Sequence, residues 1–242
     1  MDVVALGELL IDFTENGISS QGNPLFEANP GADMMLTEEE IPEELILETR
    51  IFHFGTLSMT HENVRRATKK AVAIAKQAGA IISFDPNIRE PLWNSMDEAR
   101  EQVLYGLGQC HILKISDNEI QWLTGKNDYT EAVKWIREKY DIPLILVSMG
   151  KEGSRAYYQD RIVEKAPFIN ENTIETTGAG DTFWACVLHY ICKHGLENLT
   201  EKNLKEMLTY ANAAASIITT RKGALRVMPR PEEIEALIAG HH

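Results

Sequence analysis

Apolar residues along this chain recur at two spacings that alternate from one end to the other. Short apolar runs typical of buried strands are found at 3–7, 51–55, 80–84, 111–115 and 142–147. Apolar positions at helical spacing predict amphipathic helices at 61–78, 95–107, 130–140 and 204–219. Alternation of this kind predicts a parallel sheet with helices on both faces, which is an α/β fold.

Turn-forming residues predict two hairpins within this pattern. Asn-Gly, Gly-Asn-Pro and Asn-Pro-Gly clusters break up residues 13–31, and the β-prone pieces between them favour a small hairpin or flap. Residues 154–159 and 161–166 read as paired strands around Asp160. Because the chain has neither a tandem repeat nor a low-complexity linker, we expect a single domain over residues 1–242.

Composition and charge narrow the class of protein. The chain has 242 residues, 44% of them hydrophobic and 25% charged, which is ordinary for a globular protein with one large core. A formal charge of −12 argues against nucleic-acid and anionic-membrane partners. Three scattered cysteines form neither a disulfide framework nor a zinc pattern, and no basic or cleavable apolar leader is seen, so we expect a cytoplasmic protein.

The stretch from Glu175 to Ala185 has the strongest chemical signal. Gly178, Ala179 and Gly180 precede a run of apolar positions at helical spacing, so a tight turn should open directly into a buried helix. The first amides of such a helix and its positive dipole end attract anions. A carboxylate at Asp181 would repel an anion unless it takes a proton from a hydroxyl that attacks a phosphoryl group. The alternative is a glycine-rich loop capped by Asp181.

These residues resemble the D-T-x-G-A-G-D signature of the ribokinase-like (PfkB) family of sugar and nucleoside kinases, with Glu175 in place of the leading aspartate. Within that family the chain is most similar to the fructokinases. The resemblance implies a three-layer Rossmann-like ribokinase core with a mostly parallel sheet. It further implies that Gly178, Ala179 and Gly180 form an anion hole and that Asp181 is the catalytic base. The implied reaction is ATP-dependent phosphorylation of a sugar hydroxyl, with fructose as the best single candidate and Mg²⁺ as cofactor.

Polar residues after predicted strands supply candidates for the sugar and phosphate side. The resemblance places Asp12 after the first strand, where its carboxylate would accept hydrogen bonds from sugar hydroxyls. Asp85, Asn87 and Arg89 follow a strand at the edge where open parallel sheets bind ligands. The alternatives are a solvated loop for Asp12, and a turn with an Asp85–Arg89 pair for the second group.

A second group of candidates belongs to the nucleotide side. The family pattern K-x-N-x-x-E is matched at Lys114 and Glu119, with Ser116 replacing the asparagine, and it implies that Glu119 acts through waters on magnesium. Ser116 and Glu119 also have the spacing of a helix capping box, which needs no ligand. The same S-x-x-E spacing at Ser95 predicts another capping box.

The remaining nucleotide-side candidates lie in glycine-rich or alanine-rich segments. Ser148, Gly150 and Gly153 resemble the family's (T/S)-x-G-x-x-G loop near the nucleotide phosphates, although a hairpin turn also needs such glycines. Asn212 resembles a family residue near the adenine. The loop at Gly223 resembles one that closes over the nucleotide and helps hold a monovalent cation, which adds K⁺ to the expected ions.

The chain departs from the family near its start. Asn29-Pro30-Gly31 runs at once into Ala32-Asp33, which resembles the segment after the second lid strand of relatives. We therefore expect an internal block to be missing around residues 29–33, with the lid largely absent and residues 13–31 as its remnant. This loss leaves two further functions open: a non-catalytic or minimal nucleotide-binding core, and a nucleoside or ketodeoxy-sugar kinase. Relatives often dimerise through the lid, so a homodimer stays open as well.

Overall fold

The computed structural model describes residues 1–6, 12–18, 24–29, 35–223 and 225–240, with backbone alone for 12–18 and 24–29. It divides into two compact units, Met1–Cys110 and His111–His242, and each is described by itself. The side chain of Asp12 and the junction expected at 29–33 lie outside the described residues. The single domain expected over 1–242 stays a prediction.

The first unit contains a parallel sheet and a separate hairpin. Its strands β1, β4 and β5 pair in parallel in that order, while β2 and β3 pair antiparallel in a sheet of their own. The hairpin agrees with the one predicted within 13–31. The elements of this unit are β1 (Val3–Leu6), β2 (Asp12–Ile18), β3 (Pro24–Asn29), α1 (Glu43–Leu47), β4 (Ile51–Gly55), α2 (Glu62–Gln77), β5 (Ile81–Asp85) and α3 (Met96–Leu107), with 3-10 turns at Glu38–Glu40, Leu57–Met59 and Glu90–Leu92.

Helices α2 and α3 pack side by side against this sheet. An ion pair between Arg65 of α2 and Glu98 of α3 joins them, and the Arg65 guanidinium lowers the pKa of the Glu98 carboxyl by donating to it. Helix α3 lies tight against β5 at Gly106, because a Cβ there would stand 2.2 Å from the Phe84 ring. The core of the unit is completed by fully buried aromatic side chains of β4 and β5 at Phe52, Phe54 and Phe84.

The second unit contains both parallel and antiparallel strands. Strands β6 and β7 are parallel, and β8 and β9 follow β7 as an antiparallel meander. Its elements are β6 (Ile112–Ser116), α4 (Asp117–Thr124), α5 (Tyr129–Arg137), β7 (Leu144–Ser148), β8 (Ser154–Tyr158), β9 (Arg161–Lys165), α6 (Ala179–His194), α7 (Glu201–Ile218) and α8 (Pro231–Ala239), with 3-10 turns at Gly150–Glu152 and Leu225–Val227.

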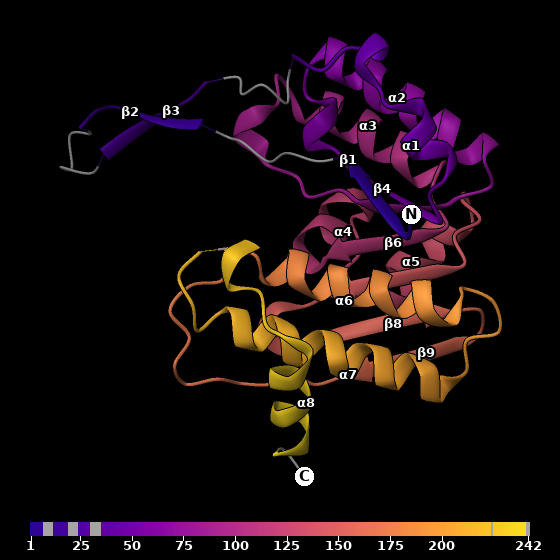
Figure 1. Cartoon of the computed structure of the whole chain (residues 1–242), viewed down its shortest axis with the longest axis vertical. Coiled ribbons are helices and arrows are strands. Elements are labelled where there is room, and N and C mark those ends of the chain that lie inside the picture. The colour runs from indigo at the N-terminus through magenta and orange to yellow at the C-terminus, as the bar shows by residue number, and fades with distance from the viewer. Residues whose placement is uncertain (7–11, 19–23, 30–34, 224, 241–242) are drawn as a thin grey trace. The chain divides into compact units, whose positions relative to one another are not determined.

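Helices cover both faces of the sheet in this unit. Successive side chains of a strand point to opposite faces. In β8 the Ser154 hydroxyl donates to Asn212 of α7, whereas the Tyr157 hydroxyl lies 3.4 Å from that of Thr130 in α5. Helices α7 and α5 therefore lie on opposite faces of β8. Figure 1 shows α6 and α7 side by side along β8 and β9, which completes three layers within this unit.

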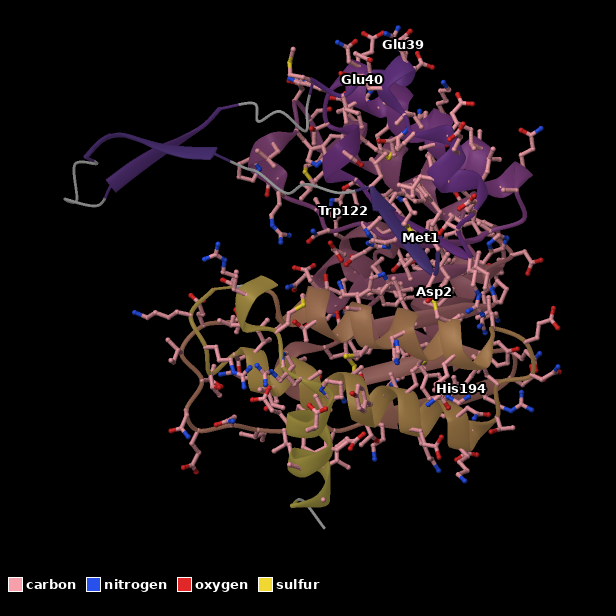
Figure 2. All side chains as sticks on the ribbon, viewed as in Figure 1. Met1, Asp2, Glu39, Glu40, Trp122 and His194 are labelled. Carbon is pink, nitrogen blue, oxygen red and sulfur yellow. The ribbon has the colours of Figure 1, made fainter. Side chains whose placement is uncertain are left out.

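The predicted class and most of the predicted elements are confirmed. Strands expected at 51–55 and 111–115 are found at Ile51–Gly55 and Ile112–Ser116, and the helix expected at 61–78 is Glu62–Gln77. The acidic Glu39 and Glu40 are exposed, as Figure 2 shows. Among the described residues, no helix is both long and apolar enough to cross a membrane.

Candidate active site

The turn at Gly178 opens directly into α6, as the glycine pattern predicts. Gly178 caps the helix with φ of +75°, a left-handed conformation that favours glycine. The N–H of Ala179 donates to Thr176 C=O at 3.2 Å, and the first helical bond runs from Thr182 N–H to Gly178 C=O at 2.8 Å. The amides of Gly180 and Asp181 therefore stand ahead of the helical hydrogen bonds, at the positive end of the α6 dipole.

A buried lysine lies against this turn. Lys114, in the middle of β6, is only 6% exposed. Its Nζ lies 3.6 Å from the position that a Cβ on Gly180 would take, and its Cε lies at 3.8 Å. A glycine at 180 thus leaves the space between the lysine ammonium and the helix amides open. Positive charge and backbone donors meet there, and this combination suits a phosphate oxygen.

Asp181 follows these amides in the first turn of α6 and is exposed. The next residues, Thr182, Phe183 and Trp184, are buried and fix the helix on the rest of the unit. An exposed carboxylate beside an anion-binding turn can accept a proton from a bound hydroxyl. The thiol of Cys186, one turn further along, is no nucleophile, because burial raises its pKa to about 11.

Ser116 and Glu119 form the capping box that their spacing predicts. The Glu119 carboxylate accepts from the Ser116 N–H at 2.9 Å and from the Ser116 hydroxyl at 2.8 Å, and Glu119 N–H donates back to the hydroxyl at 3.4 Å. The cap holds Glu119 beside the carboxyl end of β6. Ser148 ends β7 in register with Ser116, so the two serines share one edge of the sheet. A contact of Glu119 with magnesium, and of Ser148 with phosphate, stays a prediction.

The loop with Gly150 and Gly153 is a hairpin turn between β7 and β8. Met149 N–H donates to Gly153 C=O at 2.9 Å, and Ser148 pairs with Ser154. A Cβ on Gly153 would lie 2.1 Å from the Lys165 carbonyl oxygen, whereas open space surrounds Gly150. Glycine at 153 is thus required by the chain's own backbone. The predicted approach of both glycines to a nucleotide stays a prediction.

Asn212 of α7 is 6% exposed and fastens that hairpin to the end of β9. Its amide nitrogen donates to the carbonyls of Lys165 at 3.2 Å and Ala166 at 3.1 Å, and its oxygen accepts from the Ser154 hydroxyl at 2.9 Å. These bonds use the polar atoms of the side chain. Sequence reasoning missed this role. The predicted position of Asn212 near an adenine stays a prediction.

Glu175 contacts the loop after α7, which sequence reasoning also missed. Its carboxylate accepts from the Gly223 N–H at 2.9 Å, and Gly223 has φ of +112°. The signal was present in the sequence, since Glu175 is the residue that departs from the family signature. Gly223 is exposed, and its predicted role in closing over a nucleotide stays a prediction.

The candidates of the first unit gather after β5. Asp85 is buried at the end of the strand, Asn87 has a left-handed φ of +46°, and Arg89 is exposed. Pro86 C=O accepts from both the N–H and the hydroxyl of Thr56, which fixes the turn. Arg89 donates to Ile88 C=O at 3.1 Å and forms no ion pair among the described residues. The alternative of an Asp85–Arg89 pair is therefore wrong, while sugar or phosphate binding stays a prediction.

The described residues contain no group of three His, Cys, Asp or Glu side chains placed to hold a metal ion. Such a group is not required for magnesium bound mainly through phosphates and water, to which proteins typically add one or two carboxylates.

Sequence comparison identifies relatives of the chain. The model of the pfkB family carbohydrate kinases matches residues 17–231. Fructokinase-1 of Zea mays is 39% identical over 214 residues, which are 88% of this chain and 66% of the maize protein. The chain thus spans just under two thirds of the length of that relative.

Solved structures agree with the sequence relatives. A putative ribokinase II from E. coli in complex with ATP and Mg²⁺ has a TM-score of 0.78 and 27% identity, covering 90% of this chain and 68% of that one. A double mutant of fructokinase from Vibrio cholerae O395, with fructose, ADP and potassium ion bound, has a TM-score of 0.78 and 26% identity, covering 94% and 71%. These likenesses confirm the predicted ribokinase-like fold.

Proposed function

This chain belongs to the pfkB family of carbohydrate kinases, and from that premise we propose that it transfers the γ-phosphoryl group of ATP to a sugar hydroxyl. Fructose is the first candidate, because the maize relative is a fructokinase. The observation that carries the proposal is the start of α6. There the exposed Asp181 adjoins amides that precede the helical hydrogen bonds, with the Lys114 ammonium beside Gly180.

The residues at this turn fit an anionic phosphate group. Gly180 has no side chain to fill the space in front of the Lys114 ammonium. Asp181 accepts the proton of the sugar hydroxyl while its oxygen forms a bond to the γ-phosphorus and the bond to the leaving ADP oxygen breaks. The amides of Gly180 and Asp181, the α6 dipole and Lys114 stabilise the negative charge that spreads over the transferred oxygens.

Two ions accompany this proposal. Magnesium, when bound to the nucleotide, neutralises phosphate charge, and the E. coli relative was solved with ATP and Mg²⁺. We propose Glu119 as its water-mediated contact, since the capping box holds this carboxylate next to Ser116 at the strand edge. K⁺ is proposed for the Gly223 loop by analogy with the potassium-bound Vibrio cholerae fructokinase. Three free thiols suit a reducing compartment, and we propose the cytoplasm.

Sugar-dependent release of ADP tests the proposal. The full chain is assayed with ATP, Mg²⁺ and a panel of fructose, other hexoses, ribose, nucleosides and ketodeoxy sugars. We expect turnover with fructose, and Asp181→Asn should lower kcat by about 10² to 10⁴-fold because the general base is lost. The matched control is Asp141→Asn, which removes the charge of an exposed aspartate in the same unit and should leave kcat unchanged.

The competing function is a nucleotide-binding core without sugar turnover. It is favoured by the coverage of the maize relative, since 34% of that protein has no counterpart in the match (100% − 66%). In-line transfer requires a precisely held hydroxyl, and misplacing it costs orders of magnitude in rate. ATP binding by calorimetry without ADP release on any sugar would establish this alternative. Turnover on a nucleoside or ketodeoxy sugar alone would keep the kinase and replace fructose.

A further inference from the structure

The loop that follows α7 is held from two directions. On one side, Arg221 donates to Val227 C=O at 3.0 Å and forms an ion pair with Glu233 of α8. On the other side, the Glu175 carboxylate accepts the Gly223 N–H at 2.9 Å. Lys222 lies between these two anchors and is exposed. The path of the loop past Lys222 therefore depends on both contacts.

Glu175 belongs to the segment that leads into the Gly178 turn. That segment is docked on the end of α7, because the N–H groups of Ile174 and Glu175 donate to Thr219 C=O at 2.8 Å and 3.2 Å. The hydroxyls of Thr173 and Thr219 lie 3.3 Å apart. The backbone of this segment is thus fixed, and the reach of the Glu175 side chain sets where Gly223 is held.

We propose that Glu175 is a positioning residue for nucleotide binding, which rests on the proposed kinase function. Its carboxylate tethers the Gly223 amide, so that the Arg221–Gly223 segment keeps one conformation beside the segment carrying the phosphate-binding turn. Side-chain length is the critical property. An aspartate would draw the oxygen back by about one C–C bond, roughly 1.5 Å, and a bond of 2.9 Å would then exceed hydrogen-bonding distance.

Three substitutions separate length, charge and contact. Glu175→Gln keeps the length and an accepting oxygen, Glu175→Asp keeps the charge but shortens the side chain, and Glu175→Ala removes both. The matched control is Glu171→Gln, at an exposed glutamate earlier in the same connecting segment. Thermal unfolding of each variant shows that the chain is folded.

The first measurement is hydrogen exchange at the Gly223 amide, followed by NMR without ligand. A hydrogen bond to a charged acceptor protects an amide, so exchange should be about tenfold faster in Glu175→Ala and Glu175→Asp. Glu175→Gln should remain within about threefold of the wild-type rate, because a neutral acceptor bonds more weakly but still bonds. Glu171→Gln should leave the rate unchanged. Unchanged exchange in Glu175→Ala would overturn the tether.

The second measurement is steady-state kinetics with ATP and the accepted sugar. Glu175→Ala and Glu175→Asp should raise the KM for ATP about tenfold with kcat within about twofold, while Glu175→Gln restores most of the affinity. A Glu175→Asp variant with wild-type exchange and KM would overturn the inference, since charge and not reach would then matter.

Failure of the proposed function is recognised separately. If the wild-type chain has no turnover with any sugar, the affinity for ATP measured by calorimetry replaces KM, and the same ranking of variants is expected. Loss of Gly223 protection without any loss of ATP affinity would leave the tether in place and overturn its positioning role.

Discussion

The turn at Gly178–Asp181 and the hairpin turn at Met149–Gly153 each place two glycines at the end of an extended segment, yet their backbones are used differently. In the first, the missing side chain of Gly180 leaves space next to the Lys114 ammonium. In the second, the missing side chain of Gly153 is replaced by the chain itself, since Lys165 C=O comes within 2.1 Å of the position of a Cβ. One glycine keeps a place open, and the other lets two backbone segments touch.

The difference teaches how to separate glycines that serve a ligand from glycines that serve the fold. A glycine required by packing carries a stability cost when it is replaced, whereas a glycine kept for a ligand carries a binding cost. Substitutions in the two turns can therefore be compared by measuring the free energy of unfolding and the affinity for ATP on the same variants.

The largest effect is expected for Gly153→Ala. The new methyl group would collide with Lys165 C=O and Pro167 N, and the φ of +96° disfavours any side chain. We expect the free energy of unfolding, measured by urea denaturation, to fall by about 3 kcal/mol or more. Gly150→Ala is the matched control in the same turn, because open space surrounds Gly150 and only its φ of +52° is strained. Equal losses at both positions would contradict the packing argument.

A smaller loss is expected for Asn212→Ala, which removes the buried amide that holds the hairpin to β9. The carbonyls of Lys165 and Ala166 and the Ser154 hydroxyl would each lose a partner. We expect about 2 kcal/mol from urea denaturation. Ser154→Ala removes one of these three bonds and should cost about 1 kcal/mol. A Ser154→Ala loss as large as that of Asn212→Ala would show that the two carbonyl contacts contribute nothing.

The smallest effect on the fold, with the opposite profile, is expected for Gly180→Ala. A methyl group at 3.6 Å from Lys114 Nζ is in ordinary contact, and alanine favours helix over glycine, so stability should stay equal or rise by up to about 1 kcal/mol. The affinity for ATP should fall about three- to tenfold, because the methyl group occupies the space in front of the ammonium. Unchanged ATP affinity would remove Gly180 from the phosphate site.

Local patterns predicted the elements well but could not predict which partner a side chain selects. The S-x-x-E spacing at Ser95 and at Ser116 predicts two identical capping boxes. Both halves form at Ser116. At Ser95 the Glu98 N–H donates to the serine at 3.1 Å, but the Glu98 carboxylate accepts from Arg65 and Asn94 instead. Arg65 lies 33 positions away in the sequence, so its influence is invisible to a four-residue pattern.

The candidate site shows the same division. The Gly178 turn and the start of α6 follow from glycine and helix periodicity, and both were predicted. The lysine at 114 was assigned through the family pattern, whereas its position against Gly180 depends on how β6 and α6 pack. The contacts Glu175–Gly223 and Asn212–Ser154 join residues 48 and 58 positions apart, and neither follows from local spacing.

The packing of Gly106 against Phe84 restricts how this protein can change over generations. The aromatic ring occupies the place that a Cβ at 106 would need, with ring atoms between 2.2 Å and 2.6 Å away. Any larger residue at 106 would be tolerated only together with a smaller one at 84. The two positions should therefore be inherited as a pair, and in descendants of this sequence a change at one should accompany a change at the other.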